Sequence, residues 1–150
     1  MNLKTYFHHI ASPTQDKILV EAIELIRNTK VDLKQGSSKT LREQILQAFH
    51  RCGWSGKVKL GPGTNISITA VNDEYALCLQ TGNMGRFYAD LLKLQYLYQT
   101  KKIKTAIYIL PTKKAASILG SNLANFERMT NEVLLFAETI TIPITIIGIE

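Results

Sequence analysis

The sequence predicts an α/β fold in which a mixed β-sheet carries helices on both faces. Residues 65–83 alternate between apolar and polar side chains around turn residues, which is typical of a β-hairpin. Thr105–Leu110 is a short apolar run that favours a central strand. Apolar residues at helical spacing flank both segments. A length of 150 residues suits a single domain over residues 1–150.

The hairpin is expected to have two different faces. If Asn72 and Asp73 form a two-residue turn, Thr69 lies opposite Ala76 and Ser67 lies opposite Cys78. One face is then apolar and consists of Ile66, Ile68, Ala70, Tyr75, Leu77 and Leu79. The other is small and polar and consists of Asn65, Ser67, Thr69, Ala76, Cys78 and Gln80. We expect the functional site on this polar face.

One strand and two helices are predicted before the hairpin. Weak alternation over residues 3–10 indicates an edge strand. The segment Ser12-Pro13-Thr14-Gln15 has the pattern of a capped helix start, and the helix should continue to about Thr29. Thr40 and Glu43 have the spacing of a second capping box, and Gly53 should end the helix that they begin.

After the hairpin the pattern becomes helix, strand, helix, strand. Asn83 is expected to cap a helix that ends near Thr100. Thr112 should cap a long helix carrying apolar residues to Phe136, with Gly120 as a break or bend. Residues 139–149 predict the last strand, in which Pro143 indicates an edge position or a bulge.

Composition describes an ordinary globular protein, with 45% hydrophobic and 20% charged residues. No signal peptide is recognisable, and no apolar run is long enough for a membrane span. Cys52 and Cys78 lack metal-site spacing and are expected to be reduced, which favours the cytoplasm. The net charge of +6 permits nucleic-acid binding, although scattered lysines are also typical of solvated helix ends and loops.

The wording around the second hairpin strand is more specific. Cys78-Leu-Gln80-Thr-Gly-Asn83 resembles the motif of the BglII/BstYI-type restriction endonucleases, whose core is the PD-(D/E)xK nuclease fold. Residues 105–110, 121–127 and 142–148 resemble the following strand, helix and final strand of that family. The resemblance covers residues 64–150 and implies a restriction-endonuclease-like mixed β-sheet with helices on both faces.

The resemblance implies cleavage of duplex DNA with a divalent metal held by an Asp and a Glu of the hairpin, followed by a Gln. These positions correspond to Thr69, Cys78 and Gln80, so only Gln80 matches. Mg²⁺ prefers oxygen ligands that usually include a carboxylate, which neither a hydroxyl nor a thiol replaces. The sequence therefore predicts a degenerate site with no cofactor, and Mg²⁺ only if other acids have taken over.

Two acids are candidates for such a relocation. Glu43 lies on an early helix, although closing the capping box with Thr40 is a complete explanation and the preferred one. Asp90 is about two turns into the helix after the hairpin; an exposed helix position is expected, and the alternative is that it points back at the hairpin. A cysteine nucleophile at Cys78 would need a histidine, and none is tied to it by spacing. A small, buried thiol is the preferred interpretation of Cys78.

The segment Gly82-Asn83-Met84-Gly85-Arg86 is a candidate phosphate site. It combines backbone N–H groups and an arginine at a predicted helix start. A tight strand-to-helix turn capped by Asn83 is the alternative. Lys113 and Lys114 add positive charge at the start of another predicted helix and are further candidates for phosphate contacts.

Three functions follow from these observations. The first is a protein that binds duplex DNA through a nuclease fold without cleaving it, expected as a homodimer because nucleases of this type pair to cut both strands. The second is an active Mg²⁺-dependent, type II-like endonuclease that uses Glu43 or Asp90 with Gln80. The third is a non-catalytic protein-interaction subunit on the same fold.

Overall fold

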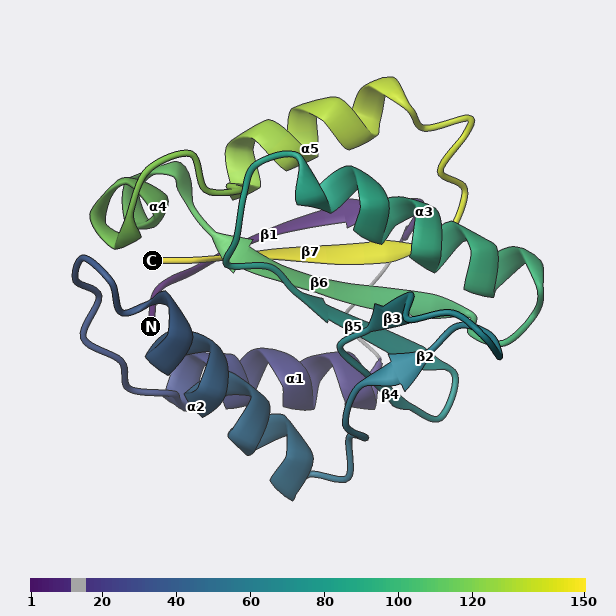
Figure 1. The fold of residues 1–150 in the computed structure, drawn as a ribbon, viewed down its shortest axis with the longest axis horizontal. Coiled ribbons are helices and arrows are strands. Elements are labelled where there is room, and N and C mark those ends of the chain that lie inside the picture. Colours follow the sequence, from purple (N-terminus) through teal and green to yellow (C-terminus); the bar gives the residue numbers. More distant parts are fainter. Residues whose placement is uncertain (12–15) are drawn as a thin grey trace.

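The computed structural model describes residues 1–11 and 16–150. Its main sheet has five strands in the order β1-β7-β6-β5-β4, and a separate two-stranded ribbon pairs β2 with β3 (Figure 1). The strands are β1 (Leu3–His8), β2 (Val58–Lys59), β3 (Ser67–Ile68), β4 (Ala70–Asn72), β5 (Tyr75–Leu79), β6 (Thr105–Pro111) and β7 (Ile144–Ile149). β5, β6 and β7 are parallel, whereas β1 and β4 run antiparallel to their neighbours. The predicted mixed sheet is confirmed.

Helices cover both faces of this sheet (Figure 1). The helices are α1 (Lys17–Asn28), α2 (Ser38–Arg51), α3 (Arg86–Gln99), α4 (Lys113–Leu119) and α5 (Phe126–Leu135). α1 and α2 pack on one face over β6 residues such as Ile107 and Ile109. α3 and α5 pack on the other face over Ala106 and Tyr108. β6 is therefore buried on both sides, as its apolar run predicts.

The hairpin has a different turn from the predicted one. Asn72 pairs with Tyr75, so Asp73 and Glu74 form the turn, with Asp73 at a φ of 51°. This shift moves the pairing by two positions and preserves the faces, because side chains alternate with a period of two. The prediction of a polar face on β5 is wrong, however. Ala76 and Cys78 are buried beneath α3.

A bend at Thr69 separates β3 from β4. β3 leaves the main sheet here and pairs with β2, Ser67 opposite Lys59. As a result Ile68 packs in the core beneath α3, whereas Ala70 and Leu77 pack with α1 and α2. The bend therefore overturns the prediction that Ile68 and Ala70 share a face.

Both N-terminal helices begin at other residues than predicted. α1 is capped by Asp16, whose carboxylate accepts from the Leu19 amide at 3.1 Å. The Ser12-Pro13-Thr14-Gln15 pattern lies outside the described residues. α2 begins at Ser38, so Thr40 and Glu43 are within the helix and form no capping box. Such a pattern also occurs on solvated helix faces. Oε1 of Glu43 lies 3.8 Å from Nζ of Lys39, with which it forms an ion pair.

The C-terminal elements correct two further predictions and confirm a third. Asn83 does not occupy the N-cap of α3; Gly85 does, and the Asn83 side chain accepts from the Gly85 amide at 3.0 Å. Thr112 caps α4 as predicted, the expected break at Gly120 is confirmed because Gly120 ends α4, and Asn125 caps α5 separately. Pro143 precedes β7, which is an interior strand between β1 and β6 rather than an edge. β1 is an edge strand, as predicted.

Candidate functional site

The candidate site is a pocket of about 610 Å³ beside the end of β5. Its walls come from α2, from the segment before β2, from β3 and the bend at Thr69, from β5 and from α3. Thr69, Cys78 and Gln80, which are distributed over twelve residues of sequence, all line it. The structure thus brings together the three positions that the family resemblance assigns to the catalytic site.

Gln80 is held at the point where β5 ends. Its backbone nitrogen donates to the Ile109 carbonyl at 2.9 Å, which continues the pairing with β6 by one residue. Its side-chain oxygen accepts from the Gly82 amide at 3.0 Å. Its side-chain nitrogen donates to Asp90 Oδ2 on α3 at 2.7 Å. Because both the oxygen and the nitrogen of its side chain are hydrogen-bonded, Gln80 links the strand, the turn and the helix.

Asp90 is the centre of this network. Oδ2 also accepts from the Tyr108 hydroxyl at 2.8 Å, and Oδ1 lies 3.0 Å from Lys93 Nζ. The Asp90 side chain is only 13% exposed, so the expectation of an exposed helix position is wrong. Burial, and then the neighbouring Asp90 charge, raise the pKa of Tyr108 well above its ordinary value. Tyr108 therefore keeps its proton and donates a hydrogen bond to the carboxylate.

Cys78 is buried and has no nucleophilic role in this geometry. Burial and, secondarily, the Asp90 charge raise the pKa of the Cys78 thiol far above its ordinary value. A neutral thiol is neither a good nucleophile nor a metal ligand. The Thr69 hydroxyl, for its part, accepts from the Leu79 amide at 3.2 Å.

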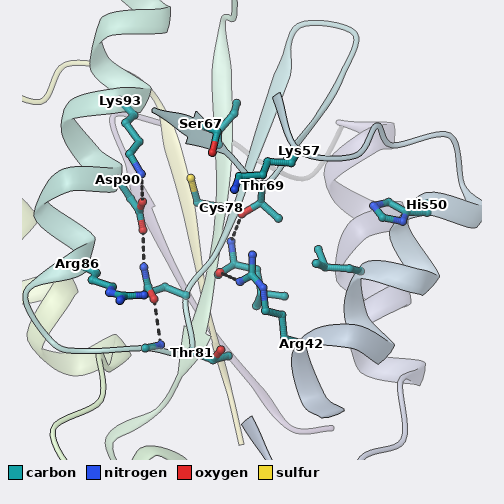
Figure 2. A pocket seen from close by; sticks show the side chains of 15 residues that line it. Arg42, His50, Lys57, Ser67, Thr69, Cys78, Thr81, Arg86, Asp90 and Lys93 are labelled. Atoms are coloured by element: carbon teal, nitrogen blue, oxygen red, sulfur yellow. Dashed lines mark hydrogen bonds and ion pairs between the residues drawn. The ribbon is translucent and has the colours of Figure 1, made fainter. Parts of the chain in front are cut away.

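Positive charge dominates the rest of the lining. The cationic side chains are Arg42 from α2, Lys57 from the segment before β2, and Arg86 and Lys93 from α3. Figure 2 shows Arg42 and Lys57 on one side of the pocket and Arg86 and Lys93 on the other. Arg42 donates to the Leu79 carbonyl, which fixes its guanidinium at the strand end. Asp90 is the single carboxylate among these lining residues.

These residues do not fit the divalent metal that the family resemblance implies. A hard cation would need oxygen ligands with negative charge. The one carboxylate already accepts from Gln80, Tyr108 and Lys93. Within residues 1–11 and 16–150, no group of three His, Cys, Asp or Glu side chains is arranged to hold a metal ion. We therefore derive no chemical step through a metal at this site.

The other predicted site residues lie elsewhere. Glu43 is exposed on α2 and does not line the pocket. Arg86 lines it together with Gly82, whereas Asn83 and Gly85 do not. Lys113 and Lys114 are at the start of α4, where Lys114 pairs with Glu150 at 2.5 Å. The candidate phosphate segment thus contributes only its first and last residues to the pocket.

Sequence reasoning missed four residues that line or support the pocket. Arg42 lies between Thr40 and Glu43 and was interpreted only as part of their capping box. Tyr108 lies within the apolar run of the predicted strand and was interpreted only as a core residue. Lys93 follows Asp90 by three residues, a spacing that places them together on a helix and was a usable signal. Lys57 carried no recognisable signal, because its position depends on the bend that brings the β2–β3 ribbon to the end of β5.

The fold is that of a restriction-endonuclease-like protein, and the pocket lies at the end of strand β5. The sequence matches the family described as "Restriction endonuclease BglII/BglIII" over residues 5–149. The chain therefore belongs to the BglII/BglIII restriction endonuclease family.

Comparison with solved structures supports the same architecture. The chain is similar to restriction endonuclease BglII in complex with a DNA 16-mer, with a TM-score of 0.86 at 14% identity, covering 100% of this chain and 79% of that one. It is also similar to free BglII, with a TM-score of 0.78 at 15% identity and coverage of 100% and 80%. No curated protein sequence matches significantly. None of the described helices is long and apolar enough to cross a membrane.

Proposed function

We propose that this protein binds duplex DNA through the face that contains the pocket and does not cleave it. Its family and fold are those of a DNA endonuclease, and a related protein of the same fold is seen in complex with DNA. The chain carries a net charge of +6, which favours association with a polyanion.

The proposed absence of cleavage is supported by the hydrogen bonds and the ion pair that already occupy the Asp90 carboxylate. Metal-assisted hydrolysis of a phosphodiester needs carboxylates that hold the ion and so generate the attacking hydroxide. Asp90 is tied to Gln80, Tyr108 and Lys93, and the neighbouring positions are Thr69 and a buried, neutral Cys78. The pocket thus offers phosphate-binding cations without a metal-binding group.

Binding and cleavage are tested separately. Fluorescence anisotropy with a labelled duplex should show binding at low salt that weakens steeply as salt rises, because counterions are released. Arg86→Ala should lower the slope of log K against log salt by about one. Arg27→Ala on α1, which removes the same charge on the opposite face of the sheet, is the matched control and should change it less.

Cleavage is assayed on plasmid DNA with Mg²⁺ or Mn²⁺, and the plasmid should remain uncut. Cutting that disappears in Asp90→Asn or Gln80→Ala would contradict the proposal. That outcome would support the second candidate, an endonuclease with a relocated acid, which the 2.7 Å contact between Gln80 and Asp90 favours. Absence of any low-salt DNA binding would support the protein-interaction subunit instead.

The expected homodimer is a further part of the proposal. Leu92 and Tyr96 are exposed on α3, at 70% and 45%, and Tyr88 is exposed one turn before Leu92. These three side chains share one face of the helix at a spacing of four residues. Sedimentation velocity across a concentration series measures the association, and Leu92→Lys should shift it towards the monomer if α3 forms the interface.

A further inference from the structure

We propose that the pocket binds a phosphate group directly through its own cationic side chains, without a metal ion. The inference rests on the proposed DNA-binding function and deepens it, because it assigns the ligand group and the contacting residues. It also reverses the charge preference of the site: the pocket takes an anion at the position where the family resemblance implies a cation.

The balance of charge supports an anion. Four cationic side chains and one carboxylate line the pocket, so its formal charge is +3 with His50 neutral. A divalent cation would enter against this charge. A phosphodiester carries a negative charge and would be attracted, and the attraction is stronger where protein walls limit solvent screening.

The cations are available to a ligand. Within residues 1–11 and 16–150, Arg42, Lys57 and Arg86 form no ion pair with a carboxylate. Arg42 uses part of its guanidinium on the Leu79 carbonyl, which orients the group. A guanidinium has five N–H donors in a fixed plane, a geometry that suits two phosphate oxygens at once.

Asp90 positions the Gln80 side chain and the Lys93 ammonium and is not a ligand. It holds the Gln80 amide and the Lys93 ammonium at 2.7 and 3.0 Å. An anionic ligand would be repelled by this carboxylate, whereas a metal would need it. The substitution Asp90→Asn preserves the shape of the side chain and removes its charge. It therefore changes phosphate affinity and metal affinity in opposite directions.

The size of the pocket fits a phosphate that belongs to a strand. About 610 Å³ is within the range of pockets that take drug-sized ligands. A phosphodiester with its flanking sugars is of that order, and a free phosphate would occupy a small part of it. The shared chemistry is the phosphate group, and the two sources are separated by experiment.

The first arm uses inorganic phosphate alone, titrated against chloride at constant ionic strength and followed by amide NMR. Saturable shifts are expected at Gln80 and Gly82, and Lys57→Ala should weaken the affinity by about tenfold, the value of one charge-assisted hydrogen bond. Lys104→Ala is the matched control. Lys104 is exposed and pairs with Glu74 in the hairpin turn, at the opposite end of β5 from the pocket. Equal effects of the two variants would overturn the inference.

The second arm tests the sign. Asp90→Asn should tighten phosphate binding, and paramagnetic Mn²⁺ added alone to the wild-type protein should leave the Gln80 and Asp90 signals sharp. Broadening of those signals by Mn²⁺, or loss of phosphate binding in Asp90→Asn with preserved amide dispersion, would overturn the inference. If Asp90→Asn does not fold, the comparison of Lys57→Ala with Lys104→Ala decides alone.

The third arm separates this inference from the proposed function. Duplex DNA should bind at least as tightly in EDTA as in Mg²⁺, because Mg²⁺ competes with the cationic side chains for the DNA phosphates. DNA binding that requires Mg²⁺ would refute the metal-free pocket and leave the DNA-binding function standing. Saturable phosphate binding without any affinity for duplex DNA at low salt would refute the DNA-binding function and support a pocket for a free phosphorylated ligand.

Discussion

The side-chain nitrogen of Gln80 lies 2.7 Å from Oδ2 of Asp90, so the end of β5 is joined to the second turn of α3. This contact spans ten residues of sequence and a turn. Both Tyr108 beneath it and Lys93 beside it donate to the same carboxylate. The arrangement satisfies a half-buried charge entirely with protein donors, which is why Asp90 contributes to structure rather than to metal binding.

Tyr108→Phe should destabilise the protein. The Tyr108 side chain is fully buried, and its hydroxyl donates to Asp90 at 2.8 Å. Phenylalanine preserves the packing and leaves the carboxylate short of one donor, at a cost of about 1–3 kcal/mol. Urea unfolding followed by circular dichroism measures this change. Tyr98→Phe is the control, since the Tyr98 hydroxyl makes no hydrogen bond within the described residues; an equal loss there would contradict the prediction.

The two cysteines should differ sharply in reactivity. Cys52 is exposed, whereas Cys78 is buried and its pKa is raised by burial. Because the thiolate is the reactive form, iodoacetamide at pH 8 should label one thiol per native chain and two in denaturant. Mass spectrometry of tryptic peptides identifies the labelled residue. Rapid native labelling that persists in Cys52→Ser would show that Cys78 is accessible after all.

Gly148→Ala should be poorly tolerated. A Cβ at Gly148, in β7, would lie 2.7 Å from Cγ of Phe126 at the start of α5. The ring must move from its place in the core, and overpacking of this kind costs about 1–3 kcal/mol. Thermal unfolding compares this variant with Gly56→Ala, where no atom lies within 4 Å. Combining Gly148→Ala with Phe126→Leu should recover part of the loss; failure to do so would place the strain elsewhere.

Stability should fall with acidification through the titration of His8. Burial lowers the pKa of His8 below its ordinary value of about 6.5; the Ile140 carbonyl, 2.6 Å from Nε2, opposes this effect and His9 adds to it. The unfolded chain then binds the proton more readily than the folded one. Stability is therefore complete above about pH 7 and decreases as the pH falls through the folded pKa.

The free energy of unfolding, measured in urea from pH 8 to 5, should show this decrease at up to about 1.4 kcal/mol per pH unit. His8→Gln retains a hydrogen-bond donor and removes the titration. Its stability should therefore be less dependent on pH over this range. An unchanged pH profile in His8→Gln would assign the effect to other groups.

The sequence predicted those features that depend on local pattern. The apolar run of β6 is buried as expected, and α3 ends at Gln99, next to the predicted end near Thr100. The predicted turn at Asn72-Asp73 was wrong because both residues suit turns and the sequence does not show where the turn begins. The pairing of Asn72 with Tyr75 places the turn one residue later. Leu134 and Phe136, which belong to the apolar pattern of the predicted long helix, are exposed, since the interruption after Leu119 sets the rotation of α5 independently.

The sequence indicated where on the chain the candidate site lies, at the second hairpin strand, but it did not predict most of the contacts within the site. Alternation on the hairpin placed Thr69, Cys78 and Gln80 on one predicted face, and the family resemblance assigned these three positions to the site. The contacts of Asp90 depend on the turn between β5 and α3 and on the parallel neighbour β6, neither of which follows from periodicity. Lys57 and Arg42 enter from segments whose approach is set by tertiary packing.

β7 is the last strand in sequence and an interior strand in space. It joins β6 to β1, and among the residues that the structure describes β1 pairs with no other strand. During synthesis the sheet therefore stays divided until Ile144–Ile149 have left the ribosome, with the earliest strand unpaired throughout. Because this long-range pairing forms only at the end of synthesis, we expect folding to be completed slowly. The exposed β6 edge should need protection while translation continues.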